Sequence, residues 1–129
     1  MSNSLLVERF ISNFDVLFST GEWVLSPRVL SECLKYSENL SIYVQRHVGG
    51  DWGQISDKDK KLNEEALALN SGVLFSAYLH CMRDGSSRTV WLMTNRLRTC
   101  TVMMFPDECF SLIDKNGSYS FVNDNDVNI

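Results

Sequence analysis

Residues 46–53, with the sequence RHVGGDWG, hold the side chains best suited to chemistry. Glycines let backbone approach a ligand closely, and a histidine can exchange a proton near neutral pH. The tight reversal that the glycines permit would place His47 near Trp52. The segment is therefore a candidate ligand-binding or partner-binding site formed by His47, Gly50, Asp51 and Trp52. The segment is also typical of a structural corner. In that interpretation the His47 ring packs on the apolar face of its helix, the Asp51 carboxylate accepts hydrogen bonds from backbone N–H groups, and the Trp52 indole fills the core. We favour the structural interpretation.

No catalytic residue is assigned from the sequence. Covalent catalysis requires a nucleophile beside a base that a third group orients, and no such trio is evident. Cys81 follows His80 directly, but successive side chains of a strand point to opposite faces. The phosphate loops G-x-x-x-x-G-K and G-x-G-x-x-G do not occur in the chain. These observations favour a protein that binds over one that catalyses.

Metal and cofactor sites are not expected either. Zinc requires clustered ligands, whereas the two histidines and the thiols are scattered and form no C-x-x-C pair. Asp124 and Asp126 lack the glycine and the distal glutamate of a calcium loop. We expect a cytoplasmic protein without cofactor whose thiols are all reduced. These thiols belong to Cys33, Cys81, Cys100 and Cys109.

The charge balance disfavours nucleic acid as the main partner. The formal net charge is −4, whereas binding to a phosphate backbone depends on many lysine and arginine contacts. Arg96 and Arg98 lie in a predicted loop between strands and are candidates for contacting an acidic partner surface or nucleic-acid phosphate. Solvated side chains are the simpler interpretation of both residues.

The first half of the chain has the periodicity of helices. Apolar residues recur at helical spacing over residues 7–18, where charges at Glu8, Arg9 and Asp15 exclude a signal peptide or a membrane span. Residues 22–25 form a short strand or an extended link. Further helices are predicted to start at Ser26-Pro27, near Leu40 and after Ser56, with glycines 49 and 50 ending the middle one. The predicted buried stripes are Val29, Leu30, Cys33 and Leu34, then Leu40, Tyr43, Val44, His47 and Val48, then Leu62, Ala66 and Leu69.

The second half reads as an antiparallel sheet. Residues 73–94 predict a hairpin about Asp84-Gly85, with Leu79 opposite Val90 and with Tyr78 opposite Trp91 on one face. A third strand is predicted over residues 99–105. The expected fold class is α+β, with a meander of three or more strands in the C-terminal half packed against three to four helices of the N-terminal half. Residues 1–114 form the single domain, and residues 115–129 are a polar tail that we expect to be mobile.

The chain resembles a family of small bacterial proteins carried on plasmids and integrative elements, known by labels such as plasmid-related protein. The most specific part is the run His-Val-x-Gly-Asp-Trp-Gly, matched by His47, Gly50, Asp51, Trp52 and Gly53. Further matches are LFSAY, TVWLMT, MFP and the isolated residues Asp59, Asn63, Ala66, Thr94, Arg98, Thr99 and Thr101. At residues 95–97 the chain departs from the acidic T-E-A-D-R block of the family. The resemblance implies a mobile-element setting and no particular reaction.

Three function hypotheses follow. The leading one is a non-enzymatic accessory protein of a mobile genetic element that binds another protein, such as a host restriction or CRISPR complex. The alternative is a small enzyme or a nucleotide-binding or ligand-binding domain centred on His47, Asp51 and Trp52. The third is a structural or regulatory homodimer formed through an exposed strand edge.

Overall fold

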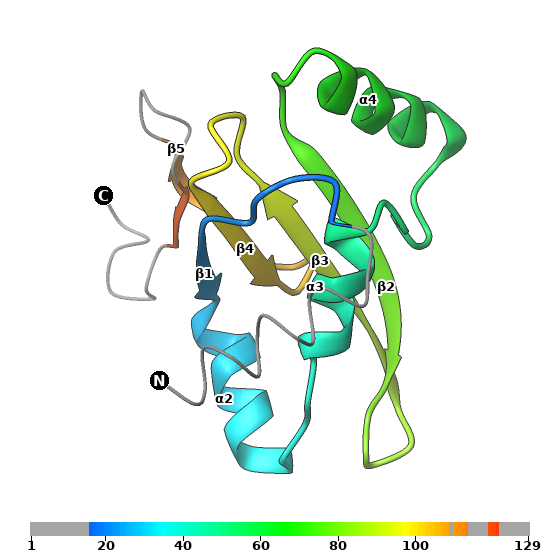
Figure 1. Cartoon of the computed structure of the whole chain (residues 1–129). Helices are drawn as coiled ribbons and strands as arrows, with labels where there is room; N and C mark the ends of the chain where they lie inside the picture. The colour runs from blue at the N-terminus through cyan, green and yellow to red at the C-terminus, as the bar shows by residue number, and fades with distance from the viewer. Residues whose placement is uncertain (1–15, 109, 114–118, 122–129) are drawn as a thin grey trace, which may run out of the picture.

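The computed structural model describes residues 16–108, 110–113 and 119–121. In these residues the chain forms an α+β fold around a four-stranded sheet of order β1-β4-β3-β2 (Figure 1). Strand β1 runs parallel to β4, and the remaining neighbours are antiparallel. Strands β5 and β6 pair separately. The elements are β1 (Glu22–Leu25), α2 (Pro27–Tyr36), α3 (Ser41–Val48), α4 (Asp57–Ala68), β2 (Leu74–Cys81), β3 (Ser87–Thr94), β4 (Cys100–Met104), β5 (Phe110–Ile113) and β6 (Tyr119–Phe121).

The main core lies between the sheet and helices α2 and α3, which cover one face. Tyr43 of α3 stacks on Tyr78 of β2 with ring centroids 5.0 Å apart. Burial of this apolar surface is the principal term that holds the helices against the sheet. The core residues are Val29, Leu40, Tyr43, Val44, Tyr78, Val90, Leu92, Met103 and Phe105.

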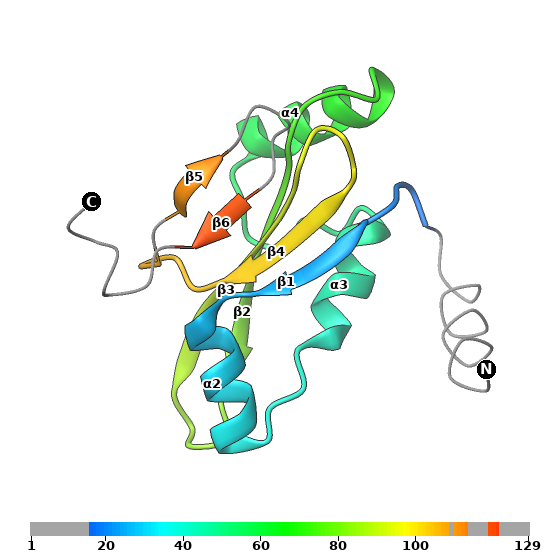
Figure 2. The same ribbon diagram turned by 90° about the vertical axis from the view of Figure 1, so that its left-hand side faces the viewer.

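A second apolar cluster lies on the other face of the sheet. Cys100, Val102 and Met104 of β4 are buried there, and Val24, Trp91 and Met93 pack against them. Figure 2 shows the β5–β6 hairpin on the side of the sheet away from α3. The central strand β4 is therefore buried on both faces.

Local capping explains where α2 and α4 begin, and both predicted starts are confirmed. The Ser26 hydroxyl accepts a hydrogen bond from the Val29 N–H, and Pro27 occupies the first turn, where no N–H partner is lost. The Ser56 hydroxyl accepts from the Asp59 N–H, and the acids Asp57 and Asp59 face the positive end of the helix dipole.

The predicted buried stripes of two helices are wrong in part. Val29 of α2 is fully buried, but Leu30 and Leu34 are 45% and 75% exposed. On α4, Leu62 and Leu69 are exposed, whereas Asn63 and Ala66 are buried. Each helix contacts the rest of the fold through a narrow stripe of residues. The leucines beside that stripe on the helix surface stay exposed to solvent.

The predicted hairpin is present, but its register is wrong by one residue. Tyr78 lies opposite Val90 and Leu79 opposite Thr89, so Tyr78 and Trp91 occupy opposite faces. The turn has three residues rather than two, because the Met82 N–H bonds to the Ser86 carbonyl. Gly85 has a φ of +89°, which fits a three-residue turn that ends in a left-handed glycine.

Residues 22–25, predicted as a strand or a link, are an edge strand of the main sheet, so the N-terminal half contributes to the sheet as well. The predicted helix over 7–18 begins outside the described residues, and residues 16–18 are not helical. Of the predicted tail, residues 119–121 form β6, and the rest lies outside the described residues, as does Cys109. Among the described residues, Cys33, Cys81 and Cys100 are thiols that form no disulfide. No helix among the described residues is long and apolar enough to cross a membrane.

Candidate functional site

His47 lies on the sheet-facing side of α3 with a fully buried side chain. Its Nδ1 atom is 2.5 Å from the Ser76 Oγ atom of β2, and its Nε2 atom is 2.9 Å from the Thr94 Oγ1 atom of β3. Thr94 in turn lies 2.6 Å from the Thr101 hydroxyl of β4, and Thr101 donates to the Thr20 carbonyl at 2.8 Å. The imidazole thus ties α3 to three strands through one buried chain of hydrogen bonds.

The donor of each hydrogen bond in this series can be assigned by starting from the Thr20 carbonyl, which can only accept. Each hydroxyl has one proton, and Thr101 uses its proton on the Thr20 carbonyl. Thr101 must then accept from Thr94, and Thr94 must accept from His47 Nε2–H. The chain of hydrogen bonds therefore places a proton on His47 Nε2. In the neutral ring Nδ1 then accepts from the Ser76 hydroxyl.

Burial explains why the imidazole stays neutral. Removal from water, followed by the positive charge of Arg98, lowers the pKa of His47 from 6.5 to about 3. Ser76 and His47 form a hydroxyl–imidazole pair, but both side chains are fully buried and cannot meet a substrate. This pair holds the fold together and offers no nucleophile.

Trp52 is also buried, with 4% of its surface exposed. Its ring lies edge-on to His47 with centroids 5.8 Å apart and stacks on Phe18 at 6.1 Å. Its indole N–H donates to the Glu64 carboxylate of α4 at 3.0 Å. Trp52 thus joins α3, α4 and the chain before β1, which agrees with the structural interpretation of the corner.

The Asp51 side chain is exposed, away from the buried His47 ring. Its carboxylate accepts from Arg46 Nε at 2.7 Å and from the Gly53 N–H at 3.2 Å. The Arg46 guanidinium, with desolvation opposing it, lowers the pKa of Asp51. The Asp51 carbonyl accepts from the Tyr78 hydroxyl at 2.6 Å. The predicted site residues therefore share a corner but do not aim their polar groups at one point.

Two glycines make this corner possible. Gly50 has a φ of +83°, and a Cβ atom there would lie 2.8 Å from the Leu17 side chain. Gly53 has a φ of +72°, and its Cβ atom would lie 2.0 Å from the Ala77 carbonyl oxygen. Only glycine fits at position 53, because the clashing atom is backbone.

Arg98, predicted as a solvated or partner-binding residue, closes the end of α4 instead. Its guanidinium donates to the carbonyls of Gly72 at 2.6 Å, Asn95 at 2.9 Å and Ala66 at 3.3 Å. It also lies 5.9 Å from the centroid of the Phe18 ring. A cation at a helix C-terminus is favourable, so Arg98 has a structural role. Arg96 is exposed in the same turn.

We expect Arg98→Ala to lower the free energy of unfolding by about 2 to 3 kcal/mol, because carbonyls that accept from a charged group lose their donor. Arg98 has a φ of +57°. Arg98→Gly should therefore be more stable than Arg98→Ala by about 1 kcal/mol, since glycine tolerates that backbone. Urea unfolding of the three proteins measures both differences. Equal stability of wild type and Arg98→Ala would contradict the assignment.

A trio that the sequence did not reveal lies at the other end of α3. The Tyr43 hydroxyl is 2.8 Å from His80 Nδ1, and His80 Nε2 is 3.0 Å from the Glu38 carboxylate. The other Glu38 oxygen accepts from the Arg83 N–H at 2.7 Å. Hydrogen bonds from His80 and Arg83 lower the pKa of Glu38, and burial raises the pKa of Tyr43. A hydroxyl, a base and an orienting carboxylate are thus aligned.

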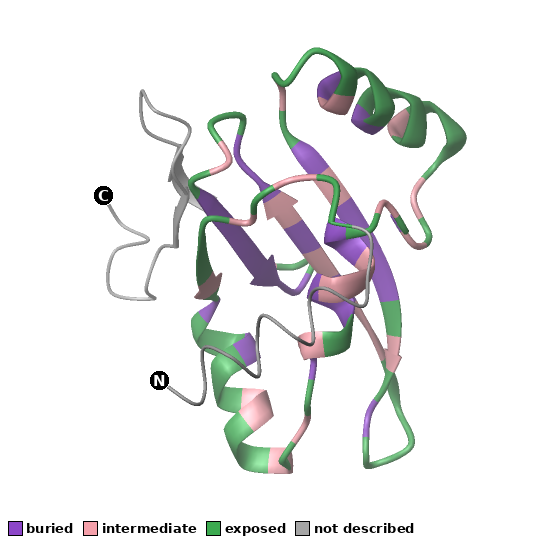
Figure 3. Cartoon of the chain, in the orientation of Figure 1, coloured by how far each residue is buried: buried purple, intermediate pink, exposed green. Residues whose placement is uncertain are grey.

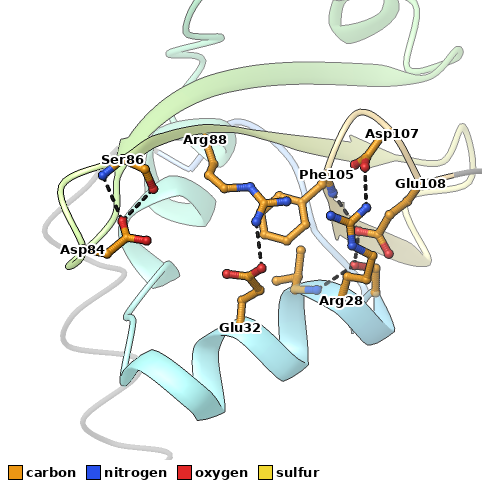
Figure 4. A network of polar contacts seen from close by, with 10 residues as sticks. Arg28, Glu32, Asp84, Ser86, Arg88, Phe105, Asp107 and Glu108 are labelled. Carbon is orange, nitrogen blue, oxygen red and sulfur yellow. Dashed lines mark hydrogen bonds and ion pairs between the residues drawn. The ribbon is translucent and has the colours of Figure 1, made fainter.

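A network of charged and aromatic side chains fixes α2 to the end of the sheet (Figure 4). Arg88 of β3 pairs with Glu32 of α2 at 2.7 Å, and its guanidinium lies 4.0 Å from the centroid of the Phe105 ring. Arg28 of α2 pairs with Asp107. The Ser26 hydroxyl donates to Glu108 at 2.5 Å. These contacts orient the exposed side of α2.

Within the described ranges, no group of three or more histidine, cysteine or acidic residues is arranged to hold a metal ion. No family model, no curated protein and no solved structure matches the chain.

Proposed function

We propose that the protein is a non-enzymatic accessory protein of a mobile genetic element that acts by binding another protein. The proposed target class is a host restriction or CRISPR complex in the cytoplasm. The mobile-element setting comes from the sequence resemblance. The structure supports the binding part, because His47 and Trp52 are buried in the fold and their polar atoms are bonded internally.

The observation that carries the proposal is the exposed apolar pair on α2, Leu30 and Leu34. These side chains are 45% and 75% exposed although the helix is firmly attached to the sheet. Residues four apart lie one above the other on a helix, so the pair forms a continuous apolar ridge. Figure 3 shows much of α2 in the exposed colour. A ridge of this kind fits an apolar groove on a partner protein.

The Glu38–His80–Tyr43 trio favours a second candidate, a small enzyme or ligand-binding domain. This trio replaces His47, Asp51 and Trp52 as the centre of that candidate. Tyr43→Phe removes the hydroxyl and keeps the stacking on Tyr78. An activity that disappears in Tyr43→Phe while the fold is retained would move this candidate to first place.

We expect Leu30→Glu and Leu34→Glu to abolish inhibition of the host system without unfolding the protein. A carboxylate forced into an apolar groove should weaken binding at least about tenfold, whereas exposed substitutions change stability by less than about 0.5 kcal/mol. The measurement is phage plating or plasmid establishment in a host with an active restriction or CRISPR system.

Leu69→Glu is the matched control. Leu69 caps the C-terminal end of α4 and is 76% exposed, which is close to the 75% exposure of Leu34. The control should retain inhibition. Inhibition should also saturate at one copy per target complex, as binding without turnover requires. Unchanged inhibition in both α2 variants, or no inhibition by the wild type in any tested system, would overturn the proposal.

A further inference from the structure

The outer edge of β1 carries a regular set of backbone groups. The N–H groups of Glu22 and Ser26 bond to the carbonyls of Thr99 and Met103, both at 2.9 Å. Along a strand, successive residues direct their backbone N–H and C=O groups to alternate sides. Glu22, Val24 and Ser26 therefore face β4, and Trp23 and Leu25 point their N–H and C=O groups away from it. In the part of the chain that the structure describes, β1 pairs with β4 alone. Its outer edge is therefore a template for another strand.

Apolar side chains accompany this edge. Trp23 is 49% exposed and Leu25 is 36% exposed, and their register partners on β4 are Thr101 and Met103. Met103 belongs to the core under α2 and α3, so both side chains are on the helix side of the sheet. Val24 is on the other face, where it packs against the cluster of Cys100, Val102 and Met104.

We propose that two copies of this chain pair antiparallel through β1, with the two-fold axis perpendicular to the sheet at Val24. Trp23 of each copy then faces Leu25 of the other as a hydrogen-bonded pair that exchanges both backbone bonds. The two Val24 residues face each other as a non-hydrogen-bonded pair. Every outward N–H and C=O group of Trp23 and Leu25 gains a partner.

The side chains agree with this register. A two-fold axis perpendicular to the sheet keeps the helix side of both copies on the same side, so each Trp23 lies beside a Leu25. Glu22 lies opposite Ser26, so the two acidic side chains are not opposed. A second copy thus satisfies the outward backbone groups and pairs the apolar side chains of both strands at once.

The expected dimer is weak. A strand of four residues offers far less than the roughly 800 Å² per partner that stable interfaces bury, so dissociation in the micromolar range is expected. The pairing does not use Leu30 or Leu34. It therefore goes beyond the proposed function and would present two target-binding ridges in one particle.

The first test is a cysteine placed on the proposed axis. Cα atoms of a non-hydrogen-bonded antiparallel pair are about 4.5 Å apart, within the range that a disulfide spans. Val24→Cys should give a covalent dimer under mild oxidation much faster than the wild type, whose native thiols set the background. Trp23→Cys should stay near that background. In the proposed register residue 23 of one copy faces residue 25 of the other, so the two introduced cysteines would not lie opposite each other. Faster cross-linking of Trp23→Cys than of Val24→Cys would overturn the proposed register.

The second test is reversible association, measured by sedimentation velocity from about 1 µM to about 1 mM. The wild type should shift from monomer to dimer, and Trp23→Lys should shift the midpoint at least about tenfold upward, since a charge on an edge strand opposes pairing. Leu97→Lys is the matched control, because Leu97 is 51% exposed in the β3–β4 turn. A wild type that stays monomeric throughout would overturn the proposal. Loss of the dimer with retained host inhibition leaves the proposed function intact.

Discussion

Replacing Trp52 with alanine is expected to lower the free energy of unfolding by about 3 to 5 kcal/mol. The indole is almost fully buried and contacts the rings of Phe18 and His47. Its removal leaves a cavity where α3, α4 and the segment before β1 meet, and the Glu64 carboxylate loses its donor. A loss of this size would consume a large fraction of the stability of a small domain.

Chemical unfolding of Trp52→Ala and Trp52→Phe separates the two contributions. Phenylalanine keeps most of the ring contacts but gives up the N–H and part of the volume, so a smaller loss of about 1 to 2 kcal/mol is expected. If Trp52→Ala unfolds at the same denaturant concentration as the wild type, Trp52 does not hold the corner.

Acid should destabilise the protein well before its carboxylates are protonated, and His47 should be the cause. Its pKa is about 3 in the folded protein and 6.5 when the ring is free in water, so the unfolded chain binds the proton more tightly. Stability is therefore fully present above pH 6.5 and falls as the pH drops towards 3. At pH 5 the difference of about 1.5 pH units corresponds to a loss of about 2 kcal/mol.

The control is His47→Gln, whose amide can accept from Ser76 and donate to Thr94 but does not titrate. The wild type should lose about 2 kcal/mol more than this variant between pH 7.5 and pH 5. The lowered pKa values of Asp51, Asp84 and Asp107 matter only below this window. A long-range proton–nitrogen NMR spectrum should also place the His47 proton on Nε2. Parallel pH curves for the two proteins would refute the neutral buried imidazole.

Helix starts could be predicted from the sequence because capping is local. Ser26-Pro27 and Ser56 satisfy orphan N–H groups within a few residues, and no distant contact is needed to recognise them. The hairpin about Asp84 and Gly85 was equally visible. Its register was not, because a two-residue and a three-residue turn share the same glycine signal and differ by one step in pairing.

Which apolar residues are buried depends on tertiary packing that periodicity alone does not contain. Leu34 and Val29 belong to one predicted stripe, yet Val29 is fully buried and Leu34 is mostly exposed. The position of α2 against β4 selects between them. The polar partners of His47 were also hidden, because Ser76, Thr94 and Thr101 come from separate strands and meet only in the folded sheet.

The candidate site could likewise be predicted from the sequence only where its residues are close together along the chain. His47 and Trp52 are near neighbours in sequence, so their proximity could be predicted from the intervening glycines. Glu38, Tyr43 and His80 come from a loop, a helix and a strand, and no spacing rule joins them. The role of Asn63 is likewise tertiary, since its side-chain amide pairs with the backbone N–H and C=O of Phe75.

This amide has a consequence for self-assembly. Along the outer edge of β2, the Asn63 side chain hydrogen-bonds to the N–H and C=O groups of Phe75. The Trp52 carbonyl and the Gln54 N–H do the same for the N–H and C=O groups of Ala77. Gly53 allows this close approach, since any larger residue there would push the segment off the strand. An incoming strand therefore cannot pair with Phe75 and Ala77 of β2, whereas among the described residues β1 pairs with β4 alone. In the proposed dimer, pairing at β1 occupies that edge in both copies, which favours a closed pair of chains over continued growth into a fibre.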